Sequence, residues 1–109
     1  MTLENLLEKA TRNEIVFKDV LSFIENNYSY TPSAFKNGKQ LNAENENQGS
    51  AKLLYFSKKN NLSKEETLKL FAEHYHSVLE SPDGNDHQNI RQFMQNGWET
   101  VSFDTQVLK

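Results

Sequence analysis

The stretch that decides the fold class runs from Ser63 to Leu79 and reads SKEETLKLFAEHYHSVL. It opens with a capping box, in which Ser63 and Glu66 can satisfy each other's backbone amides at the start of a helix. The apolar residues that follow recur with the spacing of an amphipathic helix. They are Leu68, Phe71, Ala72, Tyr75 and Leu79. This stretch predicts one long helix that packs on a core through a single face.

Helical periodicity recurs on both sides of this stretch. It predicts helices over residues 3–10, over 17–28, and from about 47–50 to 60. A last helix begins after Asp86, which is placed to cap it, and ends before Gly97. Trp98 is then expected to pack back onto Phe93, as often happens where glycine ends a helix.

Turns and one short alternating segment complete the prediction. Asn37-Gly38 and the run 81–84 (SPDG) have turn composition. Residues 101–103 alternate and allow a brief strand, paired near residues 29–31. The predicted fold is therefore a compact, mainly α single domain over residues 1–109, with about five helices and room for a short two-stranded β element.

Composition excludes several functional classes. The chain has 109 residues, a net charge of -3 and no cysteine. It lacks the concentrated Lys and Arg that a nucleic-acid binder needs, and disulfides and zinc–thiolate sites are excluded. Its longest apolar run is four residues, against the ~20 that cross a bilayer. Neither nucleic acid nor membrane is an expected partner, no secretory signal is visible, and a cytoplasmic location is expected.

The polar segment Asn42–Lys52 (NAENENQGSAK) leads directly into a buried helix. Its alternating Glu44 and Glu46, followed by Gly49, imitate the start of a calcium loop. Tyr55 stands where that loop needs its bidentate glutamate, so no metal site and no cofactor are expected. The two carboxylates are instead placed to complement a helix dipole.

The three histidines differ in placement. His74 and His76 lie two apart on the predicted helix, so they point in different directions and cannot grip one ion. His87 and Arg91 lie four apart and share a helical face, which suits anion binding or proton transfer. In the alternative interpretation, Asp86 caps the helix and Arg91 pairs with a carboxylate of the polar segment, Glu44 or Glu46.

Motifs spread over nearly the whole chain resemble the HopJ type III effector family. They are Tyr30-Thr31-Pro32, Phe35-x-Asn37-Gly38, Asn47-x-Gly49-Ser50, Leu68, Phe71, Tyr75, and the run His87-Gln88-Asn89-Ile90-Arg91-x-Phe93 followed by Gly97-Trp98. Where the family pattern has Cys, Gly, Tyr and Arg, this chain has Ala51, Ala72, His74 and His76. The resemblance implies a bacterial protein and, as an alternative location, secretion into a host cell. It implies no established activity.

Three functional hypotheses follow. The first is a protein that acts by binding a protein partner or a small anionic ligand. The second is a small enzyme, less favoured, with His87 as acid or base, Arg91 as anion clamp and Asn47 as orienting amide. The third is a metal-binding module that uses Glu44, Glu46 and His87. The residues expected to form the binding site are Asn42, Glu44, Glu46, Asn47, Ser50, His87, Asn89 and Arg91.

Overall fold

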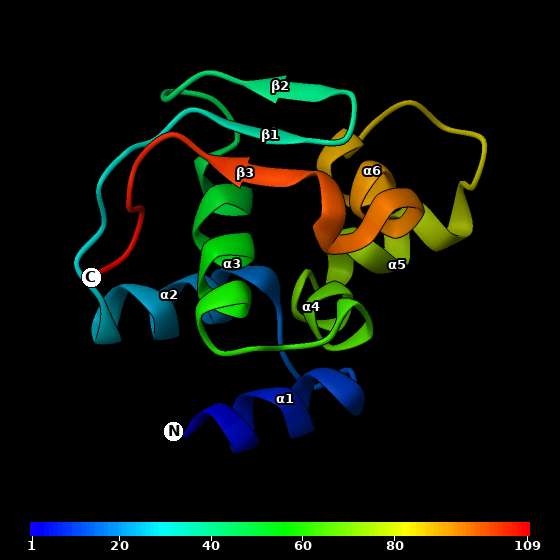
Figure 1. Cartoon of the computed structure of the whole chain (residues 1–109). Coiled ribbons are helices and arrows are strands. Elements are labelled where there is room, and N and C mark those ends of the chain that lie inside the picture. The colour runs from blue at the N-terminus through cyan, green and yellow to red at the C-terminus, as the bar shows by residue number, and fades with distance from the viewer.

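The computed structural model describes all 109 residues as six helices and a small antiparallel sheet (Figure 1). The helices are α1 (Leu3–Thr11), α2 (Phe17–Asn27), α3 (Gln48–Lys59), α4 (Lys64–Leu70), α5 (Glu73–Glu80) and α6 (Gln88–Asn96). A 3₁₀ turn, η1 (Gly97–Thr100), leads into the last strand. The strands are β1 (Phe35–Asn37), β2 (Gln40–Asn42) and β3 (Val101–Phe103). The mainly α prediction is confirmed, although the sheet means that the fold is not all-α.

The sheet has the strand order β2-β1-β3, with both pairings antiparallel. Its hairpin turns at Gly38, whose φ of 60° suits a glycine, so the predicted turn is confirmed. The predicted pairing of 101–103 with 29–31 is wrong, because β3 pairs with β1. Residues 29–31 pair instead with 107–109 through a Tyr30–Leu108 bridge. Three-residue strands are too short for sequence alternation to identify their partners.

The helix predicted over 63–79 is two helices, which corrects the prediction at one point. The capping box is confirmed, since the Ser63 hydroxyl accepts from the Glu66 amide at 3.1 Å and Glu66 Oε1 accepts from the Ser63 amide at 2.9 Å. The break falls at Ala72, whose φ of 54° and ψ of -123° no helix can contain. It changes the phase of the buried stripe, so Leu79 is 49% exposed and Val78 is buried in its place.

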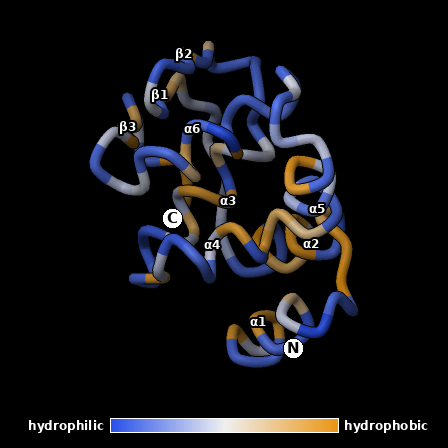
Figure 2. The backbone as a smooth tube through the Cα atoms, turned by 90° about the vertical axis from the view of Figure 1, so that its right-hand side faces the viewer, coloured by the Kyte–Doolittle hydropathy of each residue, from blue (hydrophilic) through white to orange (hydrophobic).

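The core forms around α3, which packs against α2 and α4. Its largest fully buried side chains are Phe56, Phe71 and Phe93. The sheet lies at one end of the molecule, where β1 and β2 contact α6, and α1 covers α4 at the other end (Figure 1). Hydrophilic segments dominate the region around β2 (Figure 2). Trp98 packs edge-on against Phe93 at 4.8 Å, as predicted. None of the helices has the length and apolar character needed to span a bilayer.

Candidate functional site

A cavity of about 180 Å³ lies where α3 and α6 begin. Its apolar wall comes from α2, the end of α4 and the first turn of α6, and its polar wall comes from the starts of α3, α5 and α6. The lining residues are Phe17, Phe71, Ile90, Asn47, Ser50, His74, His87, Gln88 and Asn89. The cavity therefore gathers four of the eight predicted binding residues, together with a second histidine.

The backbone at the start of both helices is unusual. Asn47 precedes α3 with φ 50° and ψ 37°, and His87 precedes α6 with φ 51° and ψ 47°. Both are left-handed conformations, which Asn and His tolerate better than most residues. A left-handed residue followed by a helical one points successive amide groups into a common concavity, a geometry that binds anions. Asn47 and His87, the left-handed residues that begin the two turns, both line the cavity.

The amides at these helix starts have no acceptor within the protein. Neither helix has a side-chain cap or an acidic residue in its first turn. No backbone oxygen accepts from the amides of residues 48–50 or 88–89. In α4 the Ser63 hydroxyl accepts from such an amide, whereas no side chain does so at the starts of α3 and α6, where the amides are free to donate to a ligand or to water.

Two imidazole rings and one hydroxyl complete the polar wall. The rings of His74 and His87 have centroids 5.0 Å apart, and His74 packs edge-on against Phe17 at 5.1 Å. Ser50 also lines the cavity, and no carboxylate does. The break at Ala72 begins a new helix and brings His74 to the cavity. A single helix continued through Ala72 therefore predicts the wrong direction for the His74 side chain.

A buried asparagine network holds the two helix starts in place. Asn42 Oδ1 accepts from Asn47 Nδ2 at 2.8 Å and from Asn89 Nδ2 at 2.9 Å. Asn42 Nδ2 donates to Asn89 Oδ1 at 3.2 Å, and Asn37 Nδ2 donates to the Asn89 carbonyl at 2.7 Å. These bonds join β1, β2, α3 and α6 through side chains that are at most 5% exposed at Asn37, Asn42 and Asn89. Asn42 thus supports the cavity without lining it.

Arg91 does not reach the cavity. Its guanidinium donates to Asp86 Oδ1 at 2.7 Å, to the Asp86 carbonyl at 2.6 Å and to the Ser81 carbonyl at 2.9 Å. The predicted pairing with Glu44 or Glu46 is therefore wrong. Asp86 is not the helix cap either, because His87 occupies that position. The side chain of a helical residue leans toward the helix N-terminus, which directs Arg91 into the turn that precedes α6.

The Arg91 contact also affects Asp86. The side-chain hydrogen bond from Arg91 lowers the pKa of Asp86 below its ordinary value, with smaller lowering contributions from the charges of His87 and Arg91 and an opposing effect of desolvation. The second carboxylate oxygen lies 4.0 Å from His87 Nε2. Asp86 is thus engaged mainly by the arginine and does not line the cavity.

Glu44 and Glu46 are exposed in the loop before α3 and do not meet His87 at a common point. Glu46 Oε1 accepts from the Ala43 amide at 3.0 Å, so it shapes the loop. No three His, Asp or Glu side chains lie close enough to hold one metal ion. A residue missed by sequence reasoning is Gln48, which accepts from the Tyr30 hydroxyl and from the Ser33 amide. No sequence pattern distinguishes it from the neighbouring amides.

Comparisons with known proteins identify the family and a similar fold. The family model described as HopJ type III effector protein matches residues 3–108. The crystal structure of VPA0580, a protein whose function is described as unknown, is similar with a TM-score of 0.91 and 44% identity. That match covers 100% of this chain and 93% of the other. No curated protein matches. The chain therefore belongs to the HopJ type III effector protein family.

Proposed function

We propose that the protein binds a small anion, such as the phosphate or carboxylate group of a metabolite, in the cavity between α3 and α6. One observation carries the proposal: the left-handed residues Asn47 and His87, which precede two helices whose first amides have no acceptor in the protein, line the same cavity, and no carboxylate lines it. Backbone amides at a helix start bind anions through hydrogen bonds and through the positive end of the helix dipole.

The side chains of the cavity support the same ligand chemistry. His74 and His87 can add positive charge when they are protonated, and Ser50 can donate a hydrogen bond. The apolar wall of Phe17 and Phe71 lowers the local polarity, which strengthens hydrogen bonds to a charged ligand.

The size of the cavity limits the ligand. Sites for drug-sized ligands enclose ~300–1,000 Å³. The volume here, about 180 Å³, suits a phosphate, sulfate or short carboxylate group rather than a whole nucleotide. A larger ligand would place its anionic group inside and leave the remainder at the surface.

The enzyme hypothesis is weaker than the binding hypothesis. His87 and Asn47 line one cavity, as it requires, but its anion clamp does not, because the Arg91 guanidinium is bound in the turn before α6. Binding needs no arginine, since the free amides supply the donors. We therefore place the binding hypothesis first and assign no catalytic step.

Phosphate titration tests the proposal. Inorganic phosphate added to the ¹⁵N-labelled protein at pH 6 is expected to shift the amide signals of residues 47–50 and 87–89. His87→Asn keeps a residue that tolerates left-handed φ and removes the imidazole, so it is expected to weaken phosphate about tenfold through loss of one charge-assisted bond. His76→Asn, on an exposed face of α5, is the matched control and is expected to change nothing.

The titration has clear contradicting results. Shifts spread over the surface, or no saturation at millimolar phosphate, would contradict a built site. Equal loss in the His76 and His87 variants would show a general charge effect.

Family membership supports a further proposal about location. We propose binding in the bacterial cytoplasm, with the interior of a host cell as the alternative that an effector family suggests. A fusion of residues 1–30 to a translocation reporter separates the two. Reporter activity in the host that requires the type III apparatus would support delivery, and retention in the bacterium would support the cytoplasmic location.

A further inference from the structure

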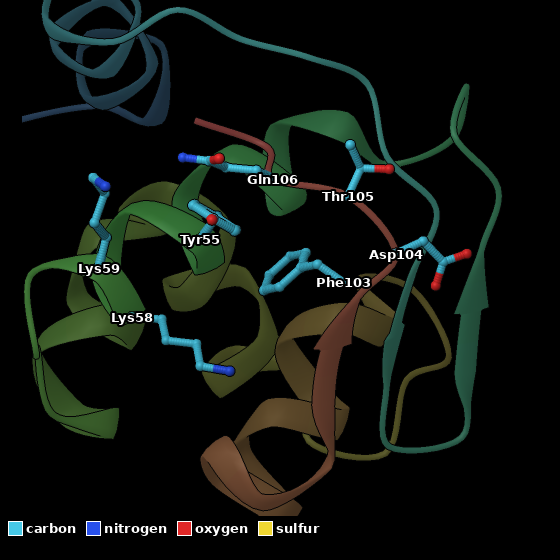
Figure 3. A pocket seen from close by; sticks show the side chains of 7 residues that line it. All are labelled: Tyr55, Lys58, Lys59, Phe103, Asp104, Thr105 and Gln106. Carbon is cyan, nitrogen blue, oxygen red and sulfur yellow. The ribbon is translucent and has the colours of Figure 1, made fainter. Parts of the chain in front are cut away.

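A second depression, of about 540 Å³, lies between α3 and β3 (Figure 3). One wall is the C-terminal half of α3, with Tyr55, Lys58 and Lys59, and the other is the chain from Phe103 to Gln106. It shares no lining residue with the cavity between α3 and α6, so its role is independent of the function proposed above.

The groove runs along an open edge of the sheet. β3 is an edge strand because it pairs with β1 alone. Phe103 lies opposite Phe35 in the sheet. The hydrogen bond beside this pair joins the next residues along the two strands, because the Asp104 amide donates to the Ala34 carbonyl at 3.1 Å. Phe103 therefore occupies a non-hydrogen-bonded position, and its N–H and C=O point away from β1, toward the open edge of the sheet. These two groups are available to another strand.

The walls combine apolar surface with unpaired positive charge. The rings of Tyr55 and Phe103 meet edge-on at 5.1 Å, and both side chains are half-buried. Lys58 and Lys59 are exposed, and neither forms a salt bridge within the chain. Figure 3 shows the carboxylate of Asp104 directed away from both lysines. The accessible charge of the groove is thus positive.

We infer that this groove binds an extended acidic segment of a partner protein, which adds to the sheet as a fourth strand beside β3. Backbone bonds to Phe103 fix the segment, since strand addition uses main-chain groups for affinity and alternate side chains for specificity. Apolar side chains of the segment lie over Tyr55 and Phe103, and its carboxylates face Lys58 and Lys59.

A second copy of this chain fits the groove less well than a foreign segment. The three strands read Phe-Lys-Asn, Gln-Leu-Asn and Val-Ser-Phe, and none contains Asp or Glu. No strand of this protein supplies the carboxylates that the two lysines would pair with.

The test uses a fluorescein-labelled hexapeptide that alternates glutamate with valine, and a control peptide in which lysine replaces glutamate. Fluorescence polarisation with the full-length protein is expected to show saturable binding of the acidic peptide only. The double variant Lys58→Glu/Lys59→Glu is expected to weaken binding about tenfold, because two attractive charge contacts become repulsive. Lys9→Glu/Lys18→Glu changes the net charge equally on exposed positions of α1 and α2 and is expected to leave binding unchanged.

Two further measurements fix the geometry. The amide signal of Phe103 is expected to shift on peptide addition, and methylation of alternate peptide nitrogens is expected to abolish binding. Failure of the acidic peptide to bind at millimolar concentration, equal binding of the basic peptide, or an unchanged Lys58/Lys59 variant would overturn the inference. A protein dimer in sedimentation that is lost in that variant would also overturn it and assign the groove to a second copy.

Discussion

At the scale of single residues, the site depends on carboxamides more than on charges. Asn42 accepts from Asn47 and Asn89 and donates back to Asn89, so one side chain links the starts of α3 and α6. An amide can donate and accept at once, which a carboxylate cannot do at neutral pH. The buried network therefore carries no net charge and leaves the neighbouring backbone donors free for a ligand.

Replacing Asn42 by Ala is expected to destabilise the protein by about 3 kcal/mol, because buried polar atoms of Asn89 lose their partner. Asn45→Ala is the matched control, since Asn45 is exposed in the same loop, and it is expected to change stability by less than about 0.5 kcal/mol. Urea unfolding of both variants measures the difference. Equal midpoints would mean that the network contributes nothing to stability.

Asp86 predicts a pH dependence of stability. Its pKa is lowered in the folded state by the Arg91 hydrogen bond, so the folded carboxyl keeps its charge at lower pH than the unfolded one. This contribution is fully present above the unfolded value of about 3.9 and is lost as the pH falls through the lowered folded pKa. Asp86→Asn is expected to lower the urea midpoint at pH 7, and the gap from the unmodified protein should narrow as the pH falls from the unfolded value of about 3.9 through the lowered folded pKa.

Asp83→Asn, in the same turn but without a bond to Arg91, is the matched control for Asp86→Asn. It is expected to follow the unmodified protein at every pH. A gap between the Asp86 variant and the unmodified protein that persists unchanged at low pH would show that the carboxylate charge is not the cause.

The sequence identifies the residues of the cavity better than it identifies their partners. Asn47, Ser50, His87 and Asn89 were expected in one binding site, and the structure places all four at one cavity. The partner of Arg91 could not be predicted, because its long side chain can reach many acceptors. Which acceptor it reaches depends on the path of the turn before α6, and tertiary contacts set that path. His74 was missed because its position follows from the backbone conformation of Ala72, which begins a new helix that the periodicity did not predict.

At the scale of elements, most helices and the strand over residues 101–103 were predictable, and the pairing of the strands was not. Amphipathic periodicity extends over two or more turns in α1, α2 and α3, so several apolar residues in each helix indicate the same buried face. Each strand has three residues, and β1 contains a single large apolar side chain, Phe35. The sheet forms because β1 pairs on one side with β2, its hairpin partner, and on the other with β3, a segment about 65 residues away. A short stretch of sequence does not reveal so distant a partner.

The break between α4 and α5 predicts that replacing alanine by glycine changes stability in opposite directions at Ala72 and at Ala51. Ala72 has φ 54° and ψ -123°, a backbone conformation that costs any residue other than glycine ~1–3 kcal/mol. Ala72→Gly removes that strain at the cost of one buried methyl group, and a net stabilisation of about 1 kcal/mol is expected. Ala51→Gly, at a buried position inside α3, is expected to destabilise by at least about 1 kcal/mol.

Thermal unfolding of the two glycine variants distinguishes these effects. A lower melting temperature for both would show that Ala72 is not strained, and that its methyl group contributes only packing. Since His74 lies two residues beyond the break, phosphate binding by the Ala72 variant also reports whether that conformation positions the imidazole.

At the scale of the whole molecule, the C-terminal residues connect distant parts of the chain. The backbones of Ser29 and Lys109 exchange two hydrogen bonds, at 2.9 and 3.0 Å, and Thr31 donates to the Val107 carbonyl at 2.8 Å. The neighbouring Tyr30 hydroxyl donates to Gln48, the first residue of α3. The last residues therefore hold the segment that supports the start of α3 at the cavity.

Leu108→Ala tests this connection. Leu108 is fully buried, so its truncation is expected to cost about 2–5 kcal/mol, a large share of the ~5–15 kcal/mol that keeps a domain folded. Leu41→Ala is the matched control, because Leu41 is 69% exposed on β2, and it is expected to cost less than about 0.5 kcal/mol. Urea unfolding measures both variants, and the amide signals of residues 47–50 should broaden in the Leu108 variant alone. A small loss with sharp signals at those positions would show that the C-terminal residues are not coupled to the cavity, and the support for α3 would then rest on the asparagine network.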